Sequence, residues 1–126
     1  MEILDNLKYT ENHEWVLIEN NLATIGVTDY AQSELGDIVY VDVDTVSQFL
    51  NIDDVFGSVE AVKTVSDLFM PVSGKVVQLN SKLDANPELI NTEPYNNGWI
   101  VKVELSGAVE NPKLLSASEY KELIGA

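Results

Sequence analysis

Residues 57–68 read Gly57-Ser58-Val59-Glu60-Ala61-Val62-Lys63-Thr64-Val65-Ser66-Asp67-Leu68. In a straight strand, Lys63 would share a face with Val59 and Val65, so its ammonium group would point toward the core. Burying an unpaired charge is costly, so the chain is expected to reverse at Lys63, with residues 59–62 and 65–68 as two arms. The two neighbours of Lys63 are not residues that tight turns usually contain. A surface lysine on an irregular strand explains the same pattern, and both interpretations remain open here.

The chemistry of a lysine on a hairpin tip suggests one use for Lys63. A modifying enzyme can reach an amine in that position, and an attached cofactor can sweep freely. A turn at Lys63 would also lack the residues that tight turns usually contain, and such local exceptions are typical of functional positions. Covalent attachment of a cofactor arm at Lys63 is therefore the functional hypothesis that these residues permit.

Alternation of apolar and polar residues continues on both sides of this stretch. It predicts strands over residues 15–18, 22–27, 38–44 and 99–105. The pair Asn20-Asn21 suits a tight reversal between the first two of these strands. The repeated period of two predicts a mainly β fold, a compact sandwich or barrel.

Two segments have helical signals instead. Thr28 or Asp29 can cap a short helix through Leu35, with Gly36 placed to end it. A capping box formed by Ser116 and Glu119 predicts a C-terminal helix that runs to Gly125. Residues 80–98 collect Asn, Pro and Gly and are expected to form a long connection with little regular structure.

Length and charge narrow the classes of function. The 126 residues fit one domain, expected to span residues 1–126. Twenty-one Asp and Glu against seven Lys, with no Arg, give a net charge of −14, which disfavours nucleic acid and anionic membranes as partners. No targeting segment or membrane span is visible, so a soluble protein is expected. The absence of Cys excludes disulfides and thiol chemistry from the unmodified chain.

Catalytic motifs are missing from the sequence. His13 is the only histidine, so a triad or a His-rich metal site would have to include it. No nucleophile elbow, P-loop or dinucleotide fingerprint is present, and no metal site is expected. His13 is interpreted as a hydrogen-bonded structural residue at the start of a strand, and lining a binding site remains open as its second role.

Six ordered blocks give the chain a resemblance to a known family. They comprise Leu7-Lys8-Tyr9-Thr10 with His13-Glu14-Trp15-Val16, residues 23–31, Leu35-Gly36-Asp37-Ile38-Val39-Tyr40-Val41, Ser58-Val59-Glu60-Ala61-Val62-Lys63, Ser66-Asp67-Leu68-Phe69 with Pro71-Val72-Ser73-Gly74, and residues 86–91 with residues 94–99. With these blocks the chain closely resembles the glycine cleavage system H proteins, which are lipoyl carriers.

The resemblance implies a fold, a cofactor and a set of partners. The fold would be a barrel-sandwich hybrid of the lipoyl/biotinyl type, and Lys63 would carry lipoic acid in amide linkage. The carrier, itself not an enzyme, would take the aminomethyl group of glycine from a pyridoxal-phosphate-dependent glycine decarboxylase to a tetrahydrofolate-dependent aminomethyltransferase. A dihydrolipoyl dehydrogenase would then reoxidise it using NAD, and a lipoyl ligase or transferase would attach the arm.

The resemblance also implies a cleft on the carrier's own surface that shelters the loaded arm. Glu14 and Asp67 match positions associated with holding the aminomethyl group, because a carboxylate suits a protonated amine. Asn12 lies where Ser or Glu is common in the family, and His13 is its neighbour in the sequence. These four residues are the candidate lining of the arm cleft.

Other functions stay open beside the carrier of glycine cleavage. A carrier that relays lipoyl groups to other proteins would use the same lysine hairpin, and an unmodified acidic interaction domain would leave Lys63 without a role. Biotin carriage is less well supported, because Val62 and Thr64 flank the lysine where biotin acceptors usually have Met. A monomer in a bacterial cytoplasm is expected, with the mitochondrial matrix as the alternative for a processed protein. The acidic surface is expected to pre-orient partner enzymes.

Overall fold

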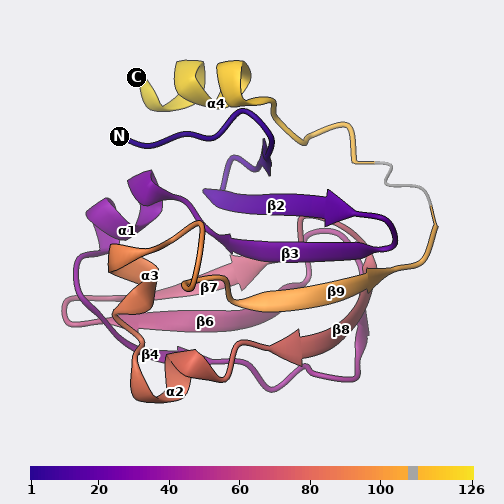
Figure 1. Ribbon diagram of the computed structural model, residues 1–126, viewed down its shortest axis with the longest axis horizontal. Coiled ribbons are helices and arrows are strands. Elements are labelled where there is room, and N and C mark those ends of the chain that lie inside the picture. Colours follow the sequence, from indigo (N-terminus) through magenta and orange to yellow (C-terminus); the bar gives the residue numbers. More distant parts are fainter. Residues whose placement is uncertain (108–110) are drawn as a thin grey trace.

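The computed structural model describes residues 1–107 and 111–126 as two antiparallel sheets with short helices at one end (Figure 1). The six-stranded sheet has the order β1-β2-β3-β9-β8-β5. Its strands are β1 (Lys8–Tyr9), β2 (Glu14–Glu19), β3 (Leu22–Val27), β9 (Val101–Leu105), β8 (Gly74–Leu79) and β5 (Phe49–Leu50). The three-stranded sheet has the order β4-β6-β7, formed by β4 (Ile38–Asp42), β6 (Val55–Ala61) and β7 (Val65–Phe69). The predicted mainly β fold is confirmed.

Both predicted helices are present and are capped as the sequence indicates. Helix α1 (Asp29–Leu35) has Thr28 as its N-cap, whose side chain accepts a hydrogen bond from the amide of Ala31, and it ends at Gly36. Helix α4 (Ala117–Ile124) has the complete capping box of Ser116 and Glu119. Each cap satisfies amides that would otherwise lack a partner in the first helical turn.

Residues 80–98 contain more structure than the sequence predicts. Helix α2 (Lys82–Ala85) and helix α3 (Leu89–Thr92) each form one turn and bury one apolar side chain, Leu83 and Ile90 respectively. Neither helix has a side-chain N-cap hydrogen bond, so the sequence has no local capping signal that predicts these helices. Tertiary burial of one residue per turn stabilises helices too short to form alone.

Strand β4 departs from the strict alternation predicted for residues 38–44. A bulge shifts the pairing with β6 between Ile38 and Tyr40, so Val39 and Tyr40 are both exposed while Val41 is buried. The strand ends at Asp42. A bulge adds a residue to one strand only, which reverses the face that the following side chains occupy.

Strand β9 begins later than the prediction of residue 99. Ile100 precedes the strand and is fully buried, although the predicted alternation placed it on the polar face. Trp99 is partly buried and packs against a second cluster of apolar residues instead. The alternating pattern therefore applies only from Val101 onward, where cross-strand pairing fixes the direction of each side chain.

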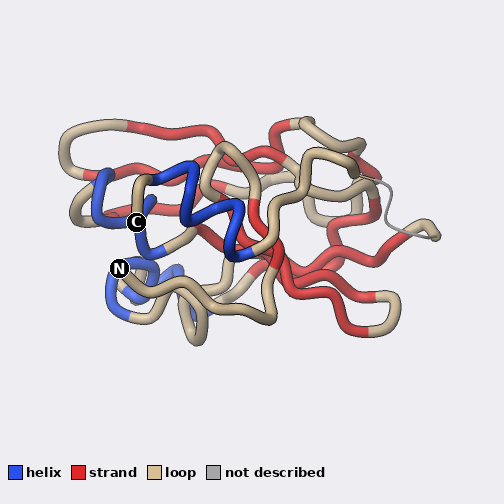
Figure 2. The backbone as a smooth tube through the Cα atoms, turned by 90° about the horizontal axis from the view of Figure 1, so that it is seen from above, coloured by secondary structure: helices blue, strands red, loops and turns tan. Residues whose placement is uncertain are grey.

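The core has two parts. The main cluster fills the space between the sheets and includes Ile25, Phe56, Val59 and Val103, all of them fully buried. The second cluster comprises Leu7, Tyr9, Trp15, Ala117 and Tyr120. It joins α4 and the N-terminal segment to β1 and β2. Figure 1 shows α4 and the N-terminal segment on the outer side of β2, and Figure 2 shows the two chain ends from above.

None of the helices in residues 1–107 and 111–126 has the length and apolarity needed to cross a membrane.

Candidate functional site

Lys63 lies in the turn between β6 and β7. The two strands pair as far as Glu60 and Val65, and the amide of Ala61 donates to the carbonyl of Thr64 at 2.8 Å, which closes the turn. The Lys63 side chain is exposed and makes no hydrogen bond or ion pair with any residue that the structure describes. The predicted reversal of the chain at Lys63 is confirmed.

A tertiary contact explains why this turn forms without Gly, Asn or Asp. The amide of Val62 donates to the carbonyl of Asp37 at 3.1 Å, so the turn is held by the segment that follows α1. That segment is in turn held by Asn91 of α3. The Asn91 Oδ1 accepts from the amide of Ile38 at 2.9 Å, and its Nδ2 donates to the carbonyl of Gly36 at 2.9 Å. Two segments far apart in the sequence, residues 36–38 and α3, therefore stabilise the turn.

The side chain of Lys63 runs past the end of α1. A Cβ added at Gly36 would lie 3.7 Å from the Cε of Lys63. Gly36 has a φ of 79°, a conformation that L side chains rarely adopt. Figures 1 and 2 both show the β6–β7 turn at the same end of the molecule as α1 and α3.

A cavity of about 240 Å³ lies between α1 and the start of β7. Its lining residues come from three segments: Asn12 and His13; Tyr30, Ala31, Glu34 and Leu35 of α1; and Ser66 of β7. Ser66 follows Lys63 by three residues, on the strand that leaves the turn. The walls combine apolar side chains with a few polar groups, as small-molecule sites do.

His13 is a hydrogen-bonded residue, as the sequence predicts, and it also lines this cavity. Its Nδ1 lies 2.9 Å from the hydroxyl of Tyr120, and its ring packs 4.9 Å from the ring of Tyr30. Burial lowers the pKa of His13 from its ordinary value, against the opposing effect of the charge on Glu34. The imidazole is therefore a hydrogen-bonded structural group that also forms part of the cavity wall.

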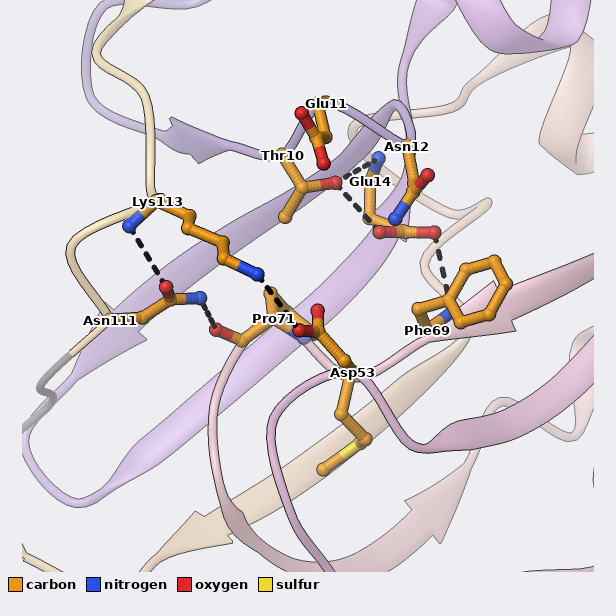
Figure 3. Close-up of a pocket in the computed structure, with 10 residues that line it drawn as sticks. Thr10, Glu11, Asn12, Glu14, Asp53, Phe69, Pro71, Asn111 and Lys113 are labelled. Atoms are coloured by element: carbon orange, nitrogen blue, oxygen red, sulfur yellow. Dashed lines mark hydrogen bonds and ion pairs between the residues drawn. The ribbon is translucent and has the colours of Figure 1, made fainter.

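Glu14 is a buried carboxyl group, 1% exposed. One carboxyl oxygen accepts from the hydroxyl of Thr10 at 2.7 Å, and the other accepts from the amide of Phe69 at 3.3 Å (Figure 3). Burial raises the pKa of Glu14 to about 7, although both hydrogen bonds favour the charged form. Glu14 and Asn12 line a second, much smaller cavity of about 20 Å³. The salt bridge between Lys113 and Asp53 is at the same cavity.

The candidate residues are only partly brought together. Asn12 lines both cavities, His13 lines the larger one and Glu14 lines the smaller one. Asp67 is exposed, pairs with Ser58 on β6 and lines neither cavity. Its neighbour Ser66 lines the larger cavity instead, because successive side chains of a strand point to opposite faces.

Several lining residues were missed in the sequence. Tyr30 and Ser66 lie in blocks that carry the family resemblance but were given no role there, and Glu34 lies in no block. The signal that could have found two of them is the spacing of α1, because residues four apart lie on one helix face. Tyr30 and Glu34 form one such pair, and Ala31 and Leu35 form the adjacent one.

Comparison with known proteins identifies the family. A model of the family described as "Glycine cleavage H-protein" matches residues 7–126. The chain belongs to the glycine cleavage H-protein family. The glycine cleavage system H proteins of Staphylococcus epidermidis and Staphylococcus haemolyticus are 52% and 54% identical to it over 125 residues, each with 99% of both chains covered.

A solved H-protein structure agrees with the fold. The crystal structure of a glycine cleavage system H protein from Mycobacterium marinum has a TM-score of 0.90 and 36% sequence identity. The match covers 98% of this chain and 100% of the other. The resemblance seen in the sequence is thereby confirmed over the full fold.

As a member of the H-protein family, the protein is a lipoyl carrier of the glycine cleavage system and is not a catalyst by itself. A relay of lipoyl groups to other proteins and an unmodified acidic domain are not favoured by these matches. The family implies a lipoyl cofactor and partner enzymes. The structure offers that cofactor a free amine on an exposed turn and a cavity beside it, so the residues present fit the group.

Proposed function

We propose that Lys63 is the residue that carries the lipoyl group, through an amide bond to its Nζ. The observation that carries this proposal is the position of Lys63, exposed on the β6–β7 turn and next to the 240 Å³ cavity. When bound, the lipoyl group supplies a redox-active disulfide, which the chain cannot supply because its sequence has no Cys. The turn presents the amine, and acylation removes its charge.

The partners are proposed from the chemistry of glycine cleavage. They are a pyridoxal-phosphate-dependent glycine decarboxylase, a tetrahydrofolate-dependent aminomethyltransferase, a dihydrolipoyl dehydrogenase that uses NAD, and a lipoyl ligase or transferase. The carrier moves the aminomethyl group of glycine from the first enzyme to the second and is then reoxidised by the third. A tether keeps each exchange at a high local concentration, which suits a carrier with several partners.

The cavity is proposed to shelter the loaded arm. Asn12 and His13 lie in its wall, and Glu14 lies at the adjoining smaller cavity, so each can exclude water from a bound amine or compensate its charge. A cation near Glu14 would favour the charged carboxylate, because opposite charges stabilise each other in a buried site. Asp67 faces outward from β7. Its side chain would have to turn toward the cavity to contact the loaded arm.

We also infer that residues 1–126 form one lipoyl-carrier domain that works as a monomer in a bacterial cytoplasm, with the mitochondrial matrix as the alternative. One main core cluster shared by both sheets supports a single domain. The relatives named above are bacterial, which supports the compartment. Sedimentation of the lipoylated protein at several concentrations tests the monomer.

Intact mass with peptide mapping tests the attachment site. The protein is produced with lipoate and a lipoyl ligase, beside a Lys63→Arg variant and a Lys121→Arg variant as the matched control. We expect one lipoyl increment on the wild type and on Lys121→Arg, mapped to Lys63, and none on Lys63→Arg. An increment that persists in Lys63→Arg contradicts the assignment of this lysine, and no increment on the wild type contradicts the proposed function.

A further inference from the structure

The outer face of the three-stranded sheet carries exposed apolar side chains beside the Lys63 turn. Tyr40 pairs with Glu60, and Glu60 pairs with Val65, so the three side chains form one row across β4, β6 and β7. Tyr40 is 54% exposed and Val65 is 61% exposed, and Val62 in the turn is 77% exposed. Single exposed apolar residues are ordinary, but a cluster next to a reactive arm points to a contact surface.

This row lies in a strongly acidic surface. Glu60 occupies its centre, and Asp42 is exposed in the next row of the same sheet. All lysines other than Lys63 belong to other parts of the fold, at positions 8, 75, 82, 102, 113 and 121. In the part of the chain that the structure describes, the one salt bridge joins Lys113 to Asp53, so Glu60 and Asp42 have no cationic partner there.

We propose that Tyr40, Val65, Glu60 and Asp42 form a docking face for an enzyme of the glycine cleavage system. The partner surface is an apolar recess that receives Tyr40 and is rimmed by Lys and Arg side chains. Charge complementarity selects this partner, because the face bears only negative charge once the Lys63 amine is acylated. The bulge in β4 is what turns Tyr40 outward. The inference rests on the proposed lipoyl attachment at Lys63.

A second copy of the chain does not suit this face. Two copies that met there would bring Glu60 and Asp42 of each together, and like charges in a desolvated contact oppose association. An enzyme that acts on the arm must also approach the Lys63 turn, and this face borders that turn. An exposed Tyr surrounded by acidic residues suits a small interface in which one aromatic side chain contributes most of the binding affinity.

The test uses fully lipoylated carrier and substitutions that preserve strand propensity. Tyr40→Thr and Val65→Thr remove the apolar contact, and Phe49→Thr removes an equally exposed aromatic side chain, also 54% exposed, from β5 in the other sheet. KM and kcat for the carrier are measured with its cognate decarboxylase, aminomethyltransferase and dihydrolipoyl dehydrogenase. We expect KM to rise about five-fold or more with at least one enzyme for Tyr40→Thr, with kcat unchanged and Phe49→Thr within about two-fold of the wild type.

The charged residues give an independent arm of the experiment. Glu60→Gln and Asp42→Asn are compared with Glu104→Gln, which removes an exposed charge from β9 in the other sheet. For the enzyme that responds to Tyr40→Thr, we expect KM to rise about three-fold for the first two variants, with less sensitivity to salt, and to stay unchanged for the third.

Two outcomes overturn the docking face. The first is a KM that no variant of the face changes with any of the three enzymes. The second is a dimer of the wild type that Tyr40→Thr dissociates in sedimentation, since the face would then contact a second copy. The intact mass of every sample is measured first. A wild type that is not lipoylated at Lys63 contradicts the proposed function before any KM is measured, so this result is distinguishable from failure of the docking face.

Discussion

Glu14 is a carboxyl group whose chemistry is changed strongly by its surroundings. Its carboxyl group is almost fully buried against Thr10 and the amide of Phe69, and burial raises its pKa to about 7. Near neutral pH the side chain is therefore divided between its protonated and charged forms. Nothing in the order of residues 10–14 distinguishes this carboxyl group from the many solvated ones in an acidic chain.

The raised pKa of Glu14 predicts a pH dependence of stability. The unfolded chain releases this proton near pH 4.5 and the folded chain near pH 7, so folding is favoured below pH 4.5 and loses free energy up to pH 7. The difference corresponds to about 3 kcal/mol, at 1.36 kcal/mol per pKa unit. Glu14→Gln mimics the protonated form, so we expect equal stability at pH 4 and a more stable variant at pH 8, measured by urea unfolding. Parallel stability curves from pH 4 to pH 8 would contradict the assignment.

At the scale of elements, the β6–β7 hairpin depends on a helix that the sequence did not reveal. Asn91 of α3 holds both Gly36 and Ile38, and the residue between them accepts the hydrogen bond from Val62 in the turn. Sequence reasoning located the reversal at Lys63 from the cost of burying its charge. The support for that turn comes from Asp37, which lies 25 residues before Val62, and from Asn91, which lies 29 residues after it.

Asn91→Ala is expected to loosen the turn that carries Lys63. The substitution leaves the amide of Ile38 and the carbonyl of Gly36 without their partner, at a cost of about 1–3 kcal/mol in the free energy of unfolding. Hydrogen exchange of the Val62 amide should become faster, and the rate of lipoylation at Lys63 should fall. Asn96→Ala, at an exposed position nearby, serves as the control. Unchanged exchange at Val62 in the Asn91 variant would show that the turn holds without this contact.

At the scale of the whole molecule, the second core cluster joins the two chain ends. Tyr120 of α4 is fully buried and stacks on Tyr9 of β1 at 4.6 Å between ring centroids. Its hydroxyl lies 2.7 Å from the Oγ1 of Thr28 and 2.9 Å from the Nδ1 of His13. The C-terminal helix therefore also supports the N-cap of α1 and one wall of the larger cavity.

Removal of Tyr120 should be among the most destabilising single changes in this part of the molecule. Tyr120→Ala creates a cavity under α4 and is expected to lower the free energy of unfolding by about 3–5 kcal/mol. Tyr120→Phe keeps the ring but loses its hydrogen bonds, with an expected cost of about 1–2 kcal/mol. Leu123→Ala, at a half-exposed position of the same helix, should cost less than Tyr120→Ala. Thermal unfolding of the three variants measures this order, and a small effect of Tyr120→Ala would contradict it.

The net charge of −14 is a property of the whole chain and predicts salt dependence of encounter. Long-range attraction to basic partner surfaces is screened within about 8 Å at physiological ionic strength. The association rate of the lipoylated carrier with its partner enzymes should therefore fall as salt rises from 20 to 200 mM, by about ten-fold for a strongly steered pair. Stopped-flow measurement at several salt concentrations checks this, and rates that do not change with salt would exclude electrostatic steering.

The β class of the fold and the caps of α1 and α4 follow from the sequence alone, and the reversal at Lys63 was one of two interpretations that the sequence left open. Each of these depends on residues within a few positions of one another, through alternation, capping hydrogen bonds or the cost of a buried charge. The sequence also shows the family resemblance, because six ordered blocks are more specific than a single motif.

The way in which these parts form a site depends on tertiary contacts. The bulge in β4 turned Tyr40 outward, burial of Ile90 stabilised α3, and strand alternation placed Ser66 in the cavity wall with Asp67 outside it. The burial of Glu14 likewise needs Phe69, 55 residues away. These features depend on contacts between distant segments. A local sequence pattern does not indicate which distant residue a given side chain will contact.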